Sequence, residues 1–236
     1  MSTEIDQPRR GRRARFAYLL VALVLIGGGL TVWLSSGSTI SHLGPEGVLV
    51  YNVPDLASAS STMSGGTVDG ISCRTLAKEK VKYHVHVHVA LYVNGQMRRL
   101  PAGIGITKPQ LVEHEKRGAF IDVGLYDCLY WLHTHVADGI IHVEAPAKRT
   151  FTLGQFFDIW GQPLGPHQVG PAKGKVVVFE NGKRLIGNPR STPLLAHGVI
   201  QIDVGSQVVP FHPLMFKVSG GCGAGKNSCG TTKPVK

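Results

Sequence analysis

The residues of this chain best suited to chemistry are histidines at alternate positions. The segment YHVHVHV, residues 83–89, places His84, His86 and His88 two residues apart, with valines between them. Side chains at alternate positions of a β-strand share one face, so the imidazoles point one way and the valines point into a core. Neutral imidazole is a good ligand for zinc, copper, nickel or iron. The pattern therefore predicts a strand that donates metal ligands.

A second cluster lies in CLYWLHTHVADGIIHVEAP, residues 128–146. Its Asp-Gly pair at 138–139 is typical of a two-residue hairpin turn. Such a turn would place four ligand-type side chains on one face and pair them across the hairpin, His135 with His142 and His133 with Glu144. Directly opposed Cβ atoms lie about 5 Å apart, within reach of a common ion. The hairpin is the tighter of the two predicted ligand clusters.

Copper or zinc is the cofactor that these residue types favour. Glu144 would either complete the shell or orient a histidine from outside it. Same-face neighbours along a strand lie about 7 Å apart, so His84 and His88 are not expected to reach one ion together. We expect His86 to face the hairpin. The spacing leaves open whether the two clusters form one site or two.

Two other classes of function remain open. A metal-dependent hydrolase would use Glu144 as a base acting on water. A non-metal interaction module would instead use the histidines to tune association between about pH 5 and 7. Neither a separate nucleophile nor a substrate pocket can be identified from the sequence, so a role other than catalysis is favoured. The histidines at 42, 114, 167, 197 and 212 are isolated in sequence and are not expected to be ligands.

Hairpins must position these side chains, and the predicted fold class is α+β, mainly antiparallel β hairpins with two short helices. Asn-Gly pairs at 94–95 and 181–182 predict two-residue hairpin turns. Further strands are expected in 47–53 and 199–204. One short helix is predicted over 106–118, and a second over 152–161, where Thr152 and Gln155 have the spacing of a capping box.

The N-terminal part predicts one transmembrane helix. Residues 16–34 carry no charge and are long enough to cross a bilayer once. Five arginines between 9 and 15 precede this run, which places the N-terminus in the cytoplasm and the rest of the chain outside. A cleaved signal peptide is the alternative, but no A-x-A-like cleavage site follows.

The expected organisation is therefore that of a single-pass protein of the cell membrane. Its parts are a basic cytoplasmic tail (1–15), the transmembrane helix (16–34), a flexible spacer (35–70), an extracytoplasmic histidine-rich domain (71–218) and a flexible tail (219–236). The expected partners are the lipid bilayer and a membrane protein complex. Nucleic acid is not expected despite the net charge of +10, because the arginines of the cytoplasmic tail supply half of it. The GGCGAGKNS segment predicts no nucleotide site, since Asn227 replaces the Ser or Thr of a phosphate-binding loop.

All four cysteines fall on the exported side, where disulfides form. Four cysteines allow three pairings. The favoured one joins Cys73 to Cys128 and Cys222 to Cys229, because the second pair closes a short local loop. The alternative for Cys222 and Cys229 is a free or metal-binding pair.

Four segments together resemble a group of bacterial membrane-anchored or exported proteins. They are YHVHVHVALYVNGQ, the PAGIGI that follows, CLYWLHTHVADGIIHVEAP and FTLGQFFDIWGQPL. The likeness covers residues 81–204 and leaves out the anchor, the spacer and the tail. It implies an exported bacterial domain and carries over neither an activity nor a catalytic residue.

Overall fold

The computed structural model describes residues 40–43, 47–59, 65–114, 118–121 and 126–216, and all structural statements below concern these residues. They belong to one compact unit. The predicted cytoplasmic tail, the transmembrane helix and the tail with Cys222 and Cys229 lie outside them. No helix in the described part is long and apolar enough to cross a membrane.

The described chain is built mainly from short strands. In chain order the elements are β1 (Ile40–Leu43), β2 (Leu49–Tyr51), β3 (Thr67–Val68), β4 (Ile71–Arg74), the 3₁₀ turn η1 (Leu76–Lys78), β5 (Tyr83–Val93), β6 (Gln96–Arg98), β7 (Leu111–His114), β8 (Gly118–Ile121), β9 (Leu129–Tyr130), β10 (Leu132–His133), β11 (Ile140–Ala145), β12 (Phe151–Thr152), α2 (Leu153–Trp160), β13 (Leu164–Gly165), β14 (Gln168–Val169), β15 (Ala172–Lys173), β16 (Val176–Glu180), β17 (Lys183–Arg184), the 3₁₀ turn η2 (Pro189–Ser191), β18 (Pro193–Leu194) and β19 (Val199–Val204).

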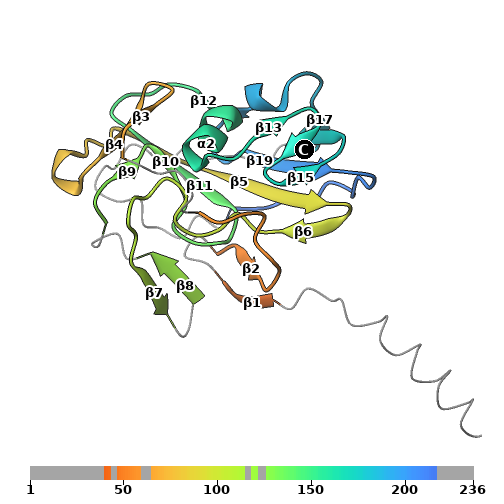
Figure 1. The fold of residues 1–236 in the computed structure, drawn as a ribbon, viewed down its shortest axis with the longest axis horizontal. Helices are drawn as coiled ribbons and strands as arrows, with labels where there is room; N and C mark the ends of the chain where they lie inside the picture. Colours follow the sequence, from red (N-terminus) through yellow and green to blue (C-terminus); the bar gives the residue numbers. More distant parts are fainter. Residues whose placement is uncertain (1–39, 44–46, 60–64, 115–117, 122–125, 217–236) are drawn as a thin grey trace, which may run out of the picture. The chain divides into compact units, whose positions relative to one another are not determined.

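One seven-stranded sheet forms the centre of the fold (Figure 1). Its order is β10-β11-β5-β19-β16-β17, with β6 paired to β5. The pairing of β19 with β5 is parallel, whereas the other pairs of this sheet are antiparallel. The α+β class with mainly antiparallel strands is thus confirmed. Strand β5 has eleven residues and pairs with β11 on one side and β19 on the other, so the alternating histidine segment lies inside the sheet.

The valine face of β5 packs into the hydrophobic core. Val87 and Val89 are buried there together with the aromatic side chains of α2, namely Phe156, Phe157 and Trp160. Burying these branched and aromatic groups removes a large apolar area from water. Because strand side chains alternate, the same packing turns the histidines of β5 to the opposite face of the sheet.

Several local predictions are confirmed. Helix α2 begins at the Thr152 N-cap, has the predicted capping box with Gln155 and ends at the left-handed Gly161. The two Asn-Gly turns join β5 to β6 and β16 to β17, and the predicted strands in 47–53 and 199–204 are β2 and β19. These turns form because asparagine and glycine tolerate the positive φ angles that a tight hairpin turn requires.

The predicted helix over 106–118 is wrong. The segment instead contains β7 and the first residue of β8, which pair antiparallel with His114 opposite Gly118. Lys108 adopts a φ of 47°, and Pro109 follows it directly. A residue before proline is disfavoured in the α conformation, so this stretch does not start a helix.

Ordered structure also begins earlier than residue 71. The predicted spacer contains β1, β2 and β3, and Val48, Val50 and Leu56 of this segment are buried.

Cys73 and Cys128 form a disulfide, which is the pairing favoured from the sequence. The bond connects β4 to the residue just before β9.

Candidate metal centre

Three neighbouring strands and the loop after β10 bring five histidines and one glutamate together on one face of the sheet. His133 of β10 lies opposite His142 of β11, which in turn lies opposite His86 of β5. His84 lies opposite Glu144 by the same β5–β11 pairing. We call the group formed by His84, His86, His133, His135, His142 and Glu144 the histidine cluster.

The hairpin that carries half of this cluster has a different register from the predicted one. The sequence predicted His135 opposite His142 and His133 opposite Glu144, whereas the structure pairs His133 with His142. The connection between β10 and β11 is therefore longer than two residues, and His135 lies within it. A shift of two residues keeps every side chain on its face, so the predicted grouping survives the wrong pairing.

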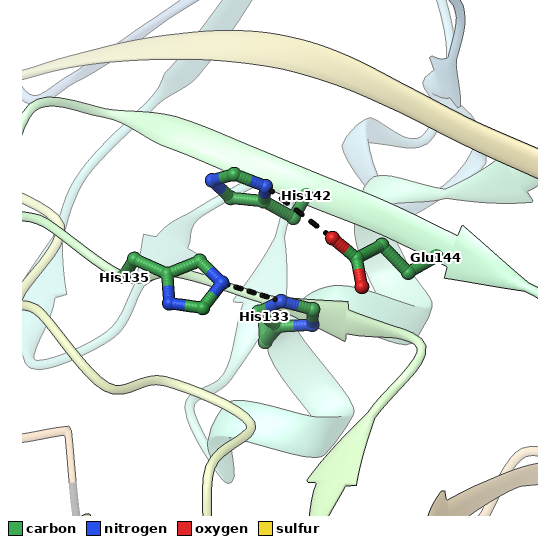
Figure 2. Close-up of side chains that lie close together, drawn as sticks. All are labelled: His133, His135, His142 and Glu144. Atoms are coloured by element: carbon green, nitrogen blue, oxygen red, sulfur yellow. Dashed lines mark hydrogen bonds and ion pairs between the residues drawn. The ribbon is translucent and has the colours of Figure 1, made fainter. Parts of the chain in front are cut away.

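His133 is held by the backbone of the strand before it. Its Nδ1 donates a hydrogen bond to the carbonyl oxygen of Tyr130 at 2.8 Å. With the proton on Nδ1, the lone pair of Nε2 is free to point into the cluster. The Nε2 atoms of His133 and His135 are 3.0 Å apart. A dashed line marks this contact in Figure 2. The two rings are hydrogen-bonded through these atoms, and the separation of two ligand nitrogens in a tetrahedral zinc site, about 3.3 Å, is only slightly longer.

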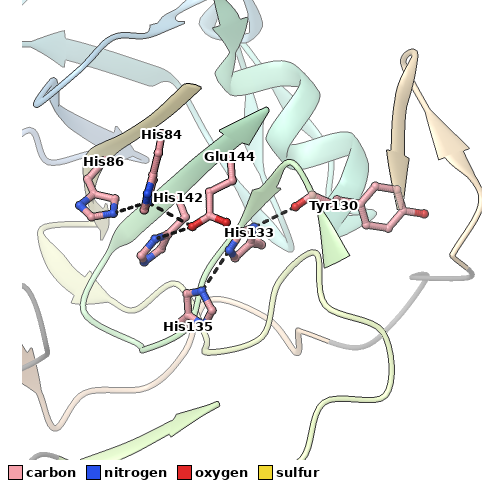
Figure 3. A network of polar contacts seen from close by, with 7 residues as sticks. All are labelled: His84, His86, Tyr130, His133, His135, His142 and Glu144. Carbon is pink, nitrogen blue, oxygen red and sulfur yellow. Dashed lines mark hydrogen bonds and ion pairs between the residues drawn. The ribbon is translucent and has the colours of Figure 1, made fainter. Parts of the chain in front are cut away.

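The β5 side repeats the same geometry. The Nε2 atoms of His84 and His86 are 2.9 Å apart. Glu144 lies between the two halves, with its Oε1 3.1 Å from His84 Nε2 and 3.8 Å from His142 Nδ1 (Figure 3). One carboxylate thus contacts imidazoles from both β5 and β11.

Two sets of donors are positioned to hold a metal ion. In the hairpin set, the ligand atoms of His133, His135, His142 and Glu144 all lie within 4.8 Å of one another. In the strand set, the same holds for His84, His86 and His142. His142 belongs to both sets. Four nitrogen and oxygen donors from one hairpin form the kind of shell that zinc and copper take in proteins.

Comparison with known proteins gives no match. No protein-family model, no curated protein and no solved structure is similar to this chain. What the site does must therefore be argued from its own geometry.

Burial keeps the cluster in its ligand form. His133 is fully buried, and His142 is 7 % exposed. Removal from water lowers the pKa of His86 and of His133 to about 4, and that of His135 to about 3. Burial, together with the neighbouring imidazoles, also places the pKa of His142 well below its usual value. Neutral imidazole is the metal-binding form, so these residues need lose no proton to bind metal at neutral pH.

The remaining histidines lie differently. His88 is on the same strand face but belongs to neither donor set, because its neighbours across the sheet are Ile140 and Val199. His197 was not expected near the site, yet its backbone N–H donates to the carbonyl oxygen of His86 at 2.8 Å. It also lowers the pKa of His86, although less than burial does. His197 lies in the loop before β19, and the parallel pairing of β19 with β5 brings that loop next to His86. A local sequence pattern cannot predict such a long-range contact.

A pocket of about 430 Å³ adjoins the cluster at Glu144. Glu79 and Trp131 line it as well, together with the basic side chains Arg74, Lys78 and Lys80. Burial, reinforced by the nearby charge of Glu144 and a hydrogen bond to it, raises the pKa of Glu79 to about 7. Glu79 lies in the charged segment AKEKVK, a pattern typical of solvent-exposed surface. The sequence therefore contains no signal that places Glu79 beside the cluster.

Proposed function

We propose that this protein is a membrane-anchored, extracytoplasmic protein that binds copper or zinc, and that it handles the metal or supports a membrane metalloenzyme. The observation that carries the proposal is the hairpin set, in which three histidines and Glu144 present donor atoms within 4.8 Å of one another. The close approach of these donors is not a chance meeting of exposed side chains, because His133 and His142 are buried.

The donor types favour copper or zinc over other ions. Imidazole nitrogens dominate both sets, and hard ions such as magnesium or calcium prefer shells made of oxygen. The described part of the chain has no thiolate ligand, because its cysteines, Cys73 and Cys128, are joined in a disulfide. Among divalent ions, a nitrogen-rich site of this kind binds copper most tightly, with zinc also favoured.

The proposed location has two supports. The uncharged run at residues 16–34 follows a cluster of arginines, which favours an anchor with a cytoplasmic N-terminus. The Cys73–Cys128 disulfide is consistent with an oxidising compartment outside the cytoplasm.

Elemental analysis tests metal binding. The full chain is purified in detergent, exposed to zinc or copper, passed through a desalting column and analysed. We expect bound metal, and we expect His142→Ala to lower the affinity by more than the roughly 10–100-fold typical of losing an outer-shell partner. His167→Ala is the matched control, because His167 is exposed and belongs to neither set. A wild-type chain that takes up neither metal would overturn the proposal.

A metal-dependent hydrolase is the second candidate, and the pocket beside Glu144 favours it. The pocket has room for a small organic substrate, and its basic side chains suit an anionic one. Glu144 would then act as a general base at the boundary between metal and pocket. Glu144→Gln should keep the metal and lose the hydrolysis of test esters. Equal activity in both proteins would exclude this role.

The pH-responsive interaction module is disfavoured. It needs histidines that titrate between about pH 5 and 7. Burial lowers the pKa of His86 and His133 to about 4, below that interval.

A further inference from the structure

The histidine cluster contains the same chelating unit twice. His84 and His86 form one unit on β5, with Nε2 atoms 2.9 Å apart. His133 and His135 form the other at the end of β10, with Nε2 atoms 3.0 Å apart. Each unit is a pair at positions i and i+2, and its two nitrogens lie slightly closer together than the about 3.3 Å between two ligand nitrogens of a tetrahedral zinc site.

His142 stands between the two units. The centre of its ring is 4.4 Å from that of His86 and 4.6 Å from that of His135, and both contacts are edge-on. Figure 3 shows the ring between the two pairs. A neutral imidazole has one nitrogen lone pair, so His142 in that form can bind either ion, and it can bind both only as an imidazolate after losing its ring proton.

One ion cannot collect all six donors in this arrangement. Ligands of a single ion at about 2.0–2.2 Å lie no more than roughly 4.4 Å apart. The donor atoms instead form two sets, each within 4.8 Å, that share only His142. A single shell would therefore leave one complete histidine pair unused in a mostly buried site.

We propose that the cluster is a two-metal centre, with one transition-metal ion on the strand set and one on the hairpin set. This inference rests on the proposed function, since both sets must first bind metal. His142 lies between the ions. Glu144 is placed to act as a bridging ligand, because its carboxylate already contacts His84 and His142. Two ions bridged by a carboxylate are a recurrent arrangement in metalloproteins, with separations of about 3.5–4 Å.

The adjoining pocket fits this arrangement. The strand set supplies three imidazoles, so an ion bound there has coordination positions left over. The pocket reaches Glu144, the carboxylate that contacts His84 of this set. The hairpin set is closer to a complete four-ligand shell, and the two ions would therefore differ in how open they are.

Stoichiometry separates the two-metal centre from a single site. The full chain in detergent is titrated with zinc, and protein-bound zinc is measured per chain. We expect two ions in the wild type and one each in His86→Ala and His135→Ala. The double variant His86→Ala/His135→Ala should bind no zinc, whereas the control His167→Ala should keep two ions. Circular dichroism of each variant checks that the fold is retained.

Copper loading gives a readout that folding defects do not imitate. Two Cu²⁺ ions within about 4 Å couple magnetically, so we expect the wild type to show a coupled electron paramagnetic resonance signal. His86→Ala and His135→Ala should each show an uncoupled Cu²⁺ signal, and the two spectra should differ. One ion per wild-type chain would overturn the two-metal centre and leave the proposed function standing. No bound ion at all would overturn both, and two ions that persist in both variants would contradict the ligand assignment.

Discussion

At the scale of single residues, the site depends on imidazoles that stay neutral inside the protein. His133 shows how this is arranged, because its Nδ1 proton is used on the Tyr130 carbonyl and its Nε2 is left for a ligand. An uncharged ring costs less to bury than an imidazolium, and the hydrogen bond fixes its tautomer. The metal-free cluster is therefore prepared for binding but vulnerable to acid.

Acid should destabilise the metal-free protein over a defined interval. The pKa of His86 and of His133 is about 4 in the folded protein, because burial lowers it from the usual value of 6.5. The unfolded chain binds more protons between these values, so the stability from the neutral rings is complete above pH 6.5 and is lost as pH falls toward 4. We expect the free energy of unfolding to drop by a few kcal/mol, on the order set by one pKa unit per 1.36 kcal/mol.

Thermal unfolding of the metal-free chain from pH 7.5 to 4 measures this loss. His167→Ala, which removes an exposed imidazole, should follow the wild-type curve. Added zinc should protect the wild type near pH 6, because it binds the neutral imidazoles of the folded protein and so favours the folded state. A melting temperature that stays constant across the interval would contradict neutral burial of the cluster.

At the scale of elements, the sequence predicted which side chains share one face of a strand but not which strands pair with each other. Alternation along 83–89 and 133–144 predicted which side chains share a face, because the strand period of two is local. The pairing of His142 with His86 joins segments more than fifty residues apart, and periodicity carries no information about such contacts. The hairpin register was missed by two residues, since the Asp-Gly pair at 138–139 lies in a longer loop than a two-residue turn.

The loop before β7 contributes to the site through its packing. Gly105 has a φ of 74°, and a Cβ placed there would lie 2.3 Å from the Leu132 carbonyl oxygen and 3.1 Å from the His133 Cβ. Only glycine lets this loop approach β10 so closely. The loop therefore sets the position of the strand that carries His133.

Gly105→Ala should destabilise the fold and weaken metal binding together. Gly70→Ala is a matched control, because Gly70 has a φ of 73° and no atom within 4 Å of the added Cβ. The control carries only the left-handed strain of about 1–2 kcal/mol, whereas Gly105→Ala adds a clash worth roughly 1–3 kcal/mol more. Urea unfolding and zinc titration of both variants test this. Equal losses in the two variants would show that the contact with β10 is unimportant.

The disulfide connects two elements near the site. Cys73 lies opposite Tyr130 in the β4–β9 pairing, and Tyr130 is the residue whose carbonyl holds His133. The bond spans 55 residues of sequence, and closing a loop of that size stabilises a protein by roughly 4 kcal/mol in the chain-entropy model.

Removing this bond should lower both the stability and the metal affinity. We expect Cys73→Ser/Cys128→Ser to lose roughly 4 kcal/mol in denaturant unfolding and to bind zinc more weakly. The control is Cys222→Ser/Cys229→Ser, which keeps the bond between β4 and β9 and should retain both properties. If the first variant keeps wild-type affinity despite its lower stability, the disulfide does not position His133.

At the scale of the whole molecule, we expect the histidine-rich domain and the predicted anchor to be separable. The described residues, from Ile40 onward, belong to one compact unit, and the uncharged run at 16–34 precedes them. Deleting residues 1–38 should therefore release a soluble chain that binds as much metal as the full one. The full chain should remain with the membrane after alkaline carbonate extraction, because a hydrophobic span of this length does not leave the bilayer. Mass spectrometry of the membrane-bound chain provides the control, since an intact N-terminus separates an anchor from a cleaved signal peptide. A full-length chain that carbonate extracts would contradict the anchor while leaving the metal centre untouched.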